Sequence, residues 1–168
     1  MMNAIPNAGA LLELVVATAI LAIGAIRDIQ ERAVENEVML MGGACGLGLS
    51  ILSGRLITRP GLYLAAVTIS LILGVGLYRV GAVGGADSKM LVILAITSPG
   101  IALDRSNVMW EGFIAASMEV LIMLLLGYMW WVYARRRNRP CVKPPLIATL
   151  LVGFVIVQLC PILWTPMM

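Results

Sequence analysis

The chain of 168 residues contains no histidine, and only 12% of its residues are charged. Without histidine, Ser-His-Asp triads, the H-E-x-x-H zinc motif and imidazole metal sites are excluded. The three cysteines, Cys45, Cys141 and Cys160, are widely spaced and form no C-x-x-C pair, so neither a disulfide framework nor a thiolate zinc site is indicated. Any chemistry must use carboxylate, hydroxyl or amine groups, and we expect no metal and no other cofactor.

Hydrophobic residues are abundant where charge is scarce: they make up 61% of the chain, and the mean hydropathy is +0.97. Because a spanning helix needs about 20 mostly apolar residues, the sequence predicts an all-α polytopic membrane protein, a bundle of about six transmembrane helices. We expect one membrane-embedded domain over residues 1–168. The net charge of +3 fits the Lys and Arg excess of cytoplasmic loops, so the lipid bilayer is the expected partner and nucleic acid is not.

Apolar runs separated by charged or Pro- and Gly-containing segments mark the expected spans. They cover residues 8–26, 38–53, 62–77, 108–134 and 146–163, with a further run that opens near Asp87 and continues from Met90 to the Ser98-Pro99-Gly100 break. The segment that follows the first run, beginning Arg27-Asp28, is expected to be a loop. Charged side chains in these intervening segments are too costly to place in the bilayer core.

The distribution of basic residues between alternate loops predicts the orientation. One set of loops holds nine Lys and Arg residues, namely Arg27, Arg32, Arg79, Lys89, Arg135, Arg136, Arg137, Arg139 and Lys143. The opposite side holds only three, Arg55, Arg59 and Arg105. Short cytoplasmic loops are enriched in basic residues. We therefore expect a multi-pass protein of the cell membrane with both termini outside and the odd-numbered loops in the cytoplasm.

Two polar segments on the expected cytoplasmic face contain the aspartates Asp28 and Asp87. Taken alone, Asp87 is equally well explained as a helix cap and Asp28 as a solvated carboxylate. Their positions at corresponding ends of different helices favour a shared site. Two carboxylates held close together cannot both ionise easily, so one keeps a proton and the pair can activate water and protonate a leaving amine.

The sequence around each aspartate resembles a known family. The run Gly84-Gly85-Ala86-Asp87 resembles the glycine, any residue, hydrophobic residue, aspartate signature of the type IV prepilin peptidases, particularly their archaeal preflagellin branch. The segment from Asp28 through Arg32 and Val34 to Asn36 is similar to the first aspartate segment of that family. Val34 and Glu35 replace the usual isoleucine and proline. The resemblance covers the whole expected six-helix chain.

This resemblance implies a membrane aspartyl endopeptidase with Asp28 and Asp87 as its catalytic dyad. It implies cleavage of short basic leader peptides from type IV prepilin-like or archaellin-like precursors at the cytoplasmic membrane face. The cysteine-bearing cytosolic segment of the bifunctional bacterial relatives is missing, so we expect no methyltransferase activity. Substrate-binding or supporting roles are expected for Gly84, Gly85, Ala86, Lys89, Arg32, Asn36, Glu31 and Glu35.

The acidic residues beside Asp28 have two possible roles. Glu31, Glu35 and Glu37 form an acidic cluster that favours a cationic leader. The alternative is that these acids only solvate the loop and balance Arg27 and Arg32, since exposed charges contribute little.

Other ionisable residues leave alternatives open. Glu13 and Glu119 lie within apolar runs, where a carboxylate indicates either function or a polar helix neighbour. A small ion- or proton-coupled transporter subunit that uses such carboxylates is therefore the runner-up, followed by a non-catalytic assembly subunit. The adjacent Ser88 and Lys89 suggest a Ser-Lys dyad, but neighbours on a helix point about 100° apart and do not face each other. The sequence does not predict an oligomeric state.

Overall fold

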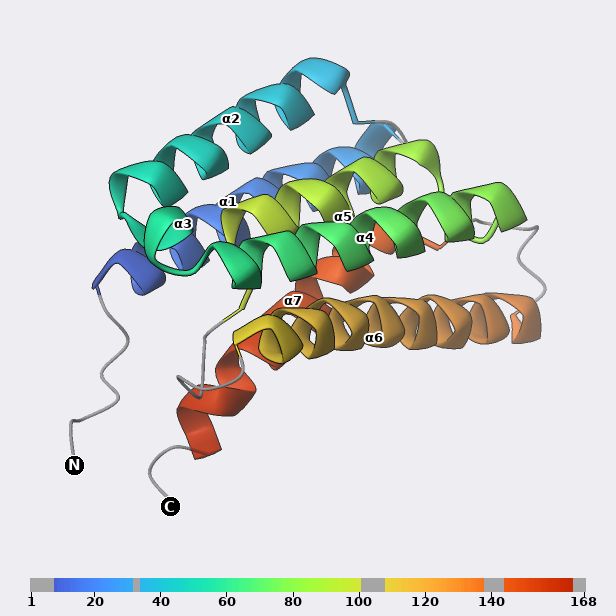
Figure 1. Cartoon of the computed structure of the whole chain (residues 1–168). Coiled ribbons are helices and arrows are strands. Elements are labelled where there is room, and N and C mark those ends of the chain that lie inside the picture. Colours follow the sequence, from blue (N-terminus) through green and yellow to red (C-terminus); the bar gives the residue numbers. More distant parts are fainter. Residues whose placement is uncertain (1–7, 32–33, 101–107, 138–143, 165–168) are drawn as a thin grey trace.

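The structure, a computed structural model, describes residues 8–31, 34–100, 108–137 and 144–164. These residues form helices joined by short connections, and no strand occurs among them (Figure 1). The helices are α1 (Ala8–Glu31), α2 (Asn36–Leu52), α3 (Arg55–Thr58), α4 (Pro60–Val80), α5 (Gly85–Thr97), α6 (Val108–Arg136) and α7 (Leu146–Trp164). The predicted all-α class is confirmed for the described part of the chain.

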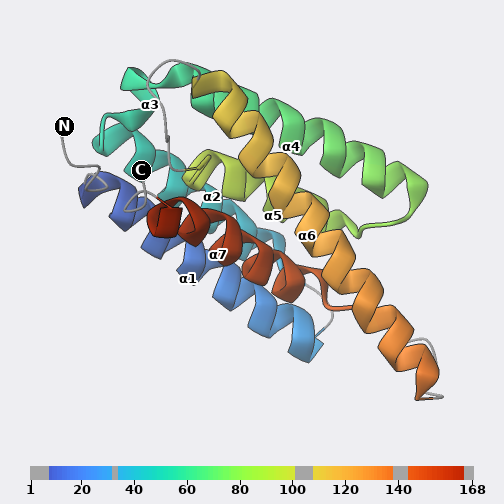
Figure 2. The same ribbon diagram turned by 90° about the horizontal axis from the view of Figure 1, so that it is seen from below.

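The short helix α5, of 13 residues, lies inside the bundle and contacts α1, α2, α4 and α7. The outer helices pack side by side in the order α2, α1, α7, α6, α4, and in Figure 2 α6 and α7 lie across the face nearest the viewer. Both α2 and α4 pack on α5 rather than on each other. The ring of outer helices is therefore open over one face of α5. The core consists of apolar side chains that include Leu21, Met90, Leu94, Ile147 and Phe154.

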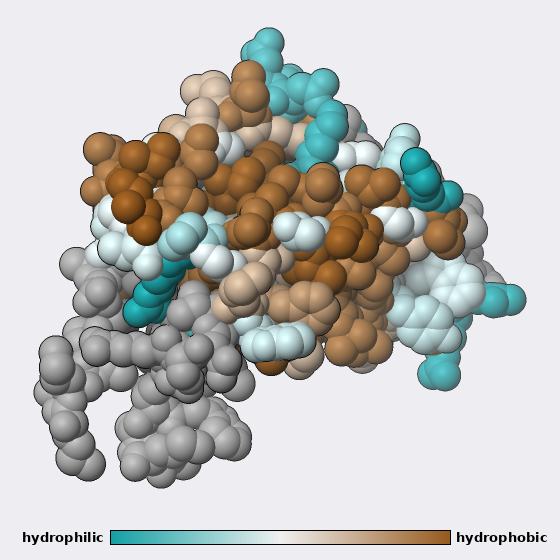
Figure 3. Space-filling view, viewed as in Figure 1, coloured by the Kyte–Doolittle hydropathy of each residue, from teal (hydrophilic) through white to brown (hydrophobic). Residues whose placement is uncertain are grey.

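Large apolar side chains cover the outside of the bundle. Leu40, Leu52, Ile57, Val80 and Trp110 are all exposed, and Figure 3 shows a broad hydrophobic face with hydrophilic residues at its margins. Within the described residues, the helices Pro60–Val80 and Met109–Arg136 are long and apolar enough to cross a membrane, and Asn36–Leu52 and Leu146–Gln158 are shorter apolar helices. This surface suits a lipid environment. The count of six spans and their orientation stay predictions.

The helices differ from the predicted runs mainly at their ends. Helix α1 continues through the charged segment to Glu31, so the prediction that a loop begins at Arg27 is wrong. Arg, Gln and Glu are good helix formers, and Arg27 pairs with Glu31 one turn later, so the helix has no reason to end where the apolar run ends. The single turn α3 was not predicted. It follows Gly54, whose positive φ of 70° is a conformation that glycine adopts without strain.

Candidate active site

Helices α1 and α5 bring Asp28 and Asp87 to the same end of the bundle. Asp28 lies in the last turns of α1, and Asp87 lies in the first turn of α5, which contacts α1 (Figure 1). One turn deeper in the bundle, a Cβ added at Gly24 would lie 2.7 Å from Met90 Cε. Gly24 is four residues before Asp28, and Met90 is three residues after Asp87. Because residues at these spacings share a helix face, the two aspartates occupy facing turns.

Asp87 also closes the first turn of its own helix. The backbone N–H of Gly84 donates a hydrogen bond to Asp87 Oδ2 over 3.0 Å, which satisfies one of the free N–H groups at the start of α5. A Cβ added at Gly84 would lie 2.9 Å from the same oxygen, so the close approach favours glycine at this position. The capping interpretation of Asp87 is therefore confirmed, and it fixes the direction of the carboxyl group.

The environment of Asp87 favours its protonated form. The residue lies in the cap turn ahead of the apolar run that begins at Met90, and its side chain is buried. The pKa of Asp87 is raised to about 6, mainly by burial and to a smaller extent by the negative charge of Asp28, while the Gly84 hydrogen bond opposes both. Asp87 therefore keeps its proton to a higher pH than an ordinary aspartate, up to about pH 6.

Two side chains next to Asp87 tie the start of α5 to the neighbouring helices. Ser88 Oγ donates a hydrogen bond to the Gly74 carbonyl of α4 over 3.0 Å. Lys89 Nζ donates one to Asn36 Oδ1 at the start of α2 over 2.7 Å. The predicted supporting residues Lys89 and Asn36 thus meet. Since Ser88 and Lys89 bond to different helices, they do not form a Ser-Lys dyad here.

The remaining predicted residues lie around this end of the bundle. Glu31, Glu35 and Glu37 are exposed, and Arg27 Nη1 lies 3.4 Å from Glu31 Oε1 and 4.0 Å from Glu35 Oε1. Arg27 therefore balances part of the acidic cluster, and such exposed pairs contribute little to stability. Gly85 is exposed and Ala86 is half-buried, both in the first turn of α5. Arg32 and Cys141 lie outside the described residues.

The sequence profile of the type IV leader peptidase family matches residues 15–162, a range that includes both aspartates. The chain belongs to the type IV leader peptidase family. Membership implies a membrane-embedded peptidase of the prepilin type, which acts on prepilin-like precursors. We find no match among curated proteins or among solved structures.

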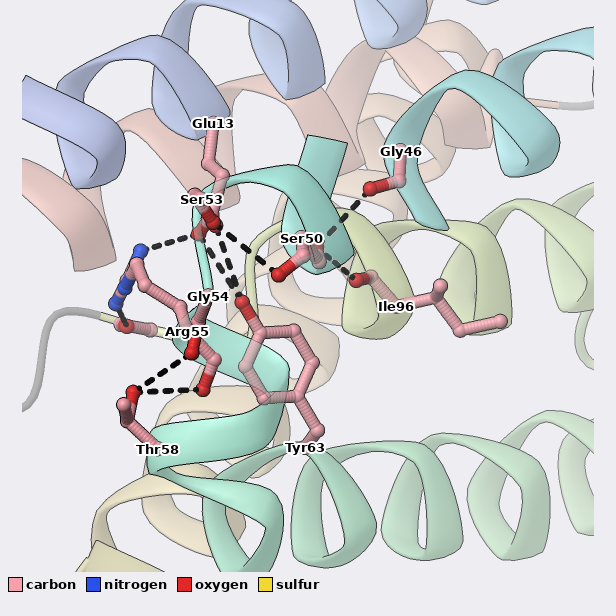
Figure 4. A network of polar contacts seen from close by, with 10 residues as sticks. Glu13, Gly46, Ser50, Ser53, Gly54, Arg55, Thr58, Tyr63 and Ile96 are labelled. Atoms are coloured by element: carbon pink, nitrogen blue, oxygen red, sulfur yellow. Dashed lines mark hydrogen bonds and ion pairs between the residues drawn. The ribbon is translucent and has the colours of Figure 1, made fainter. Parts of the chain in front are cut away.

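A second cluster of polar side chains lies at the opposite end of α1 in this leader peptidase (Figure 4). Glu13 is fully buried and forms an ion pair with Arg55 of α3. Ser53 Oγ donates a hydrogen bond to Glu13 Oε1 over 2.8 Å, and the Tyr63 hydroxyl lies 3.2 Å from both carboxylate oxygens. Arg55 Nη2 also donates to the Gly100 carbonyl. The Glu13 carboxylate is saturated with partners, which does not favour the transporter alternative.

The other carboxylate within a helix, Glu119 of α6, has a polar neighbour on α7. Gln158 Nε2 donates a hydrogen bond to Glu119 Oε1 over 3.2 Å, and both residues are buried. The interpretation of Glu119 as facing a polar helix neighbour is confirmed. Neither this pair nor the Glu13 cluster adjoins the aspartates, and within the described residues no group of three or more Cys, Asp or Glu side chains is placed to hold a metal ion.

Proposed function

We propose that the leader peptidase is an aspartyl endopeptidase in which Asp28 and Asp87 form the catalytic dyad. The observation that carries this proposal is the facing of the last turns of α1 and the first turn of α5 across the Gly24 and Met90 contact. Ionised Asp28 takes a proton from water as the water oxygen attacks the scissile carbonyl carbon. Protonated Asp87 donates its proton toward the carbonyl oxygen, and the pair then protonates the leaving amine as the C–N bond breaks.

The substrate class that fits this site is a prepilin-like or archaellin-like precursor with a short basic leader. Exposed Glu31, Glu35 and Glu37 lie on the segment that joins α1 to α2, near the two aspartates. A cationic leader gains attraction there, although Arg27 offsets part of it. The reaction is cleavage without methyl transfer. Reversal of the leader's basic residues to Glu should slow cleavage, and unchanged cleavage would remove electrostatic selection from the proposal.

The proposed orientation places the aspartates at the cytoplasmic membrane face, with six spans and both termini outside. It is supported by the end of α6, where Arg135 and Arg136 lie in the last turn, because short cytoplasmic segments are enriched in basic residues. Cys141, in the basic segment after α6, is a native reporter. A membrane-impermeant thiol reagent should label it only from the cytoplasmic side. Labelling from outside intact cells would show that the orientation is the reverse of the one proposed.

Cleavage of a co-expressed precursor tests the dyad. The wild-type chain should remove the leader, whereas Asp28→Asn and Asp87→Asn should each abolish removal, because each amide has nearly the volume of the acid but cannot take or give the proton. Glu119→Gln is the matched control, since it makes the same change to a buried carboxylate whose hydrogen-bond partner, Gln158, is neutral, so no buried charge loses its ion pair. An Asn variant that inserts normally and matures the precursor at the wild-type rate would remove that aspartate from the mechanism.

A further inference from the structure

A groove of about 880 Å³ opens on the face of the bundle where α2 and α4 do not meet. Helix α5 forms its floor and the other two helices form its walls. This is part of the hydrophobic face shown in Figure 3. The lining is apolar along most of its length, with Leu40, Ala44 and Leu47 from α2, Leu71 and Val75 from α4, and Ile93 from α5.

Polar residues occur only at one end of this lining. Asn36, Ser88 and Lys89 lie there, and the Lys89 to Asn36 hydrogen bond joins α5 to α2. Because Ser88 and Lys89 directly follow Asp87, the polar end of the groove adjoins the dyad. From Asn36 to Leu47, the wall that α2 forms extends about 16 Å along the groove, which is about three turns of helix.

We propose that this groove docks the apolar helix that follows the scissile bond of the precursor. The proposal rests on the proposed function. Three small residues in the walls, Gly43, Ala44 and Gly74, let a helix backbone approach closely. Three turns of a helix about 10 Å wide have a volume on the order of 1,250 Å³. The groove can therefore hold more than half of the volume of such a helix. The remainder faces lipid.

The charges around the groove select this occupant. Beyond its polar end lie the exposed acids Glu31, Glu35 and Glu37, and beyond its first turn the lining is apolar. A chain that is basic before the cut and apolar after it matches this order, with the scissile bond beside Asp87. A lipid chain or a second copy of the peptidase matches the apolar lining but not the acidic cluster, and both are outcomes of the test.

Filling the groove tests the proposal. Ala44→Trp places a large side chain in the groove, and Cys45→Trp is the matched control because Cys45 is the next residue on α2, is exposed and does not line the groove. Each variant of the full chain is assayed on a full-length precursor and on a short peptide that ends a few residues after the cut. Ala44→Trp should reduce kcat/KM on the precursor at least tenfold more than on the peptide, whereas Cys45→Trp should affect both substrates equally.

The two substrates separate failure of the groove from failure of the peptidase. Equal effects of Ala44→Trp on precursor and peptide would overturn docking in the groove while leaving the proposed function intact. Absence of cleavage of either substrate by the wild-type chain would contradict the proposed function itself.

Photo-crosslinking decides the occupant even if Ala44→Trp fails to fold. A photoactivatable residue at Leu47, which lines the groove, should form an adduct with the full-length precursor in lipid vesicles. The same residue at Met41, exposed on α2 but outside the groove, should give at least tenfold less adduct. Adducts from Leu47 only with lipid, or only with a second copy of the peptidase, would overturn the proposal.

Discussion

The two ends of the bundle hold buried carboxyl groups in different environments. At one end Glu13 is fully buried and is surrounded by the donors Arg55, Ser53 and Tyr63. At the other end Asp87 is buried beside a second carboxyl group, with a hydrogen bond from the Gly84 backbone. A buried charge is stable when it is paired and fully hydrogen-bonded, and it takes up a proton when it is not. The comparison indicates that the number of hydrogen-bond donors, rather than burial alone, distinguishes the environment of Glu13 from that of Asp87.

The polar side chains at each end of the bundle join different helices. The Glu13 cluster connects α1 to α3 and α4 and, through Arg55, to the Gly100 carbonyl. The dyad end connects α5 to α2 and α4 through Lys89 and Ser88. The central helix α5 is therefore fixed at its dyad end by the hydrogen bonds of Lys89 and Ser88.

Removal of the Arg55 guanidinium, which forms the ion pair with Glu13, should give the largest effect on stability. Arg55→Met leaves the buried Glu13 carboxylate without its ion pair, and breaking a buried pair in this way costs about 3–5 kcal/mol. The thermal midpoint in detergent should fall, while cleavage per folded molecule is retained. Arg79→Met, which removes an exposed arginine from α4, is the matched control and should change the midpoint little. Equal midpoints for the two variants would show that the Glu13 cluster is not a stabilising element.

Separation of α1 from α5 should have a smaller effect than loss of the Arg55 ion pair, and this effect should appear in catalytic activity. Gly24→Leu adds a Cβ that would lie 2.7 Å from Met90 Cε and 3.4 Å from Ile147 Cγ2, with further side-chain atoms beyond it. Because Met90 and Ile147 are both fully buried, we expect the added side chain to push apart the facing turns that hold the aspartates. Misplacement by about 1 Å can cost up to 10²-fold in rate, so we expect kcat to fall at least tenfold. Gly76→Leu, at an α4 position with open space around it, serves as the control. A Gly24→Leu enzyme with wild-type kcat would contradict the facing of the two turns.

The smallest expected effect is on the pH dependence. Because the pKa of Asp87 is raised to about 6, the group carries its proton below that pH and loses it above. If Asp87 is the proton donor, kcat/KM should fall by up to tenfold for each pH unit above about 6. Glu13→Gln should leave this decrease of kcat/KM above about pH 6 unchanged. A shift of this decrease to another pH in Glu13→Gln, or a kcat/KM that does not change from pH 5 to 8, would contradict the assignment of the proton to Asp87.

Local pattern was sufficient to predict much of this fold. Apolar runs located all the described helices except the single turn α3, and the Gly84-Gly85-Ala86-Asp87 run located the start of α5. The location of Asp28 and Asp87 at one end of the bundle was predicted from topology, since both were expected at one membrane face, and their pairing as a dyad stays a prediction. The end of α1 was misplaced because hydropathy marks the lipid boundary and not the end of backbone hydrogen bonding.

Contacts between distant residues were not predictable in the same way. The partner of Glu13 is Arg55, 42 residues later, and the sequence placed Arg55 only in a loop. That pairing depends on the one-turn helix α3, whose position is set by Gly54 and by Pro60 at the start of α4. The groove between α2 and α4 was missed for a similar reason, because the pattern of each helix does not show that these two helices fail to meet.

A double-mutant cycle on the two aspartates tests the central claim most directly. The rate of leader removal is measured in detergent for the wild type, Asp28→Asn, Asp87→Asn and the double variant, with the thermal midpoint of each. Residues that act as one catalytic unit are strongly non-additive. We predict that each single variant loses about as much activity as the double variant, at nearly unchanged midpoints. Single variants with separate, additive losses would contradict a dyad that shares one proton.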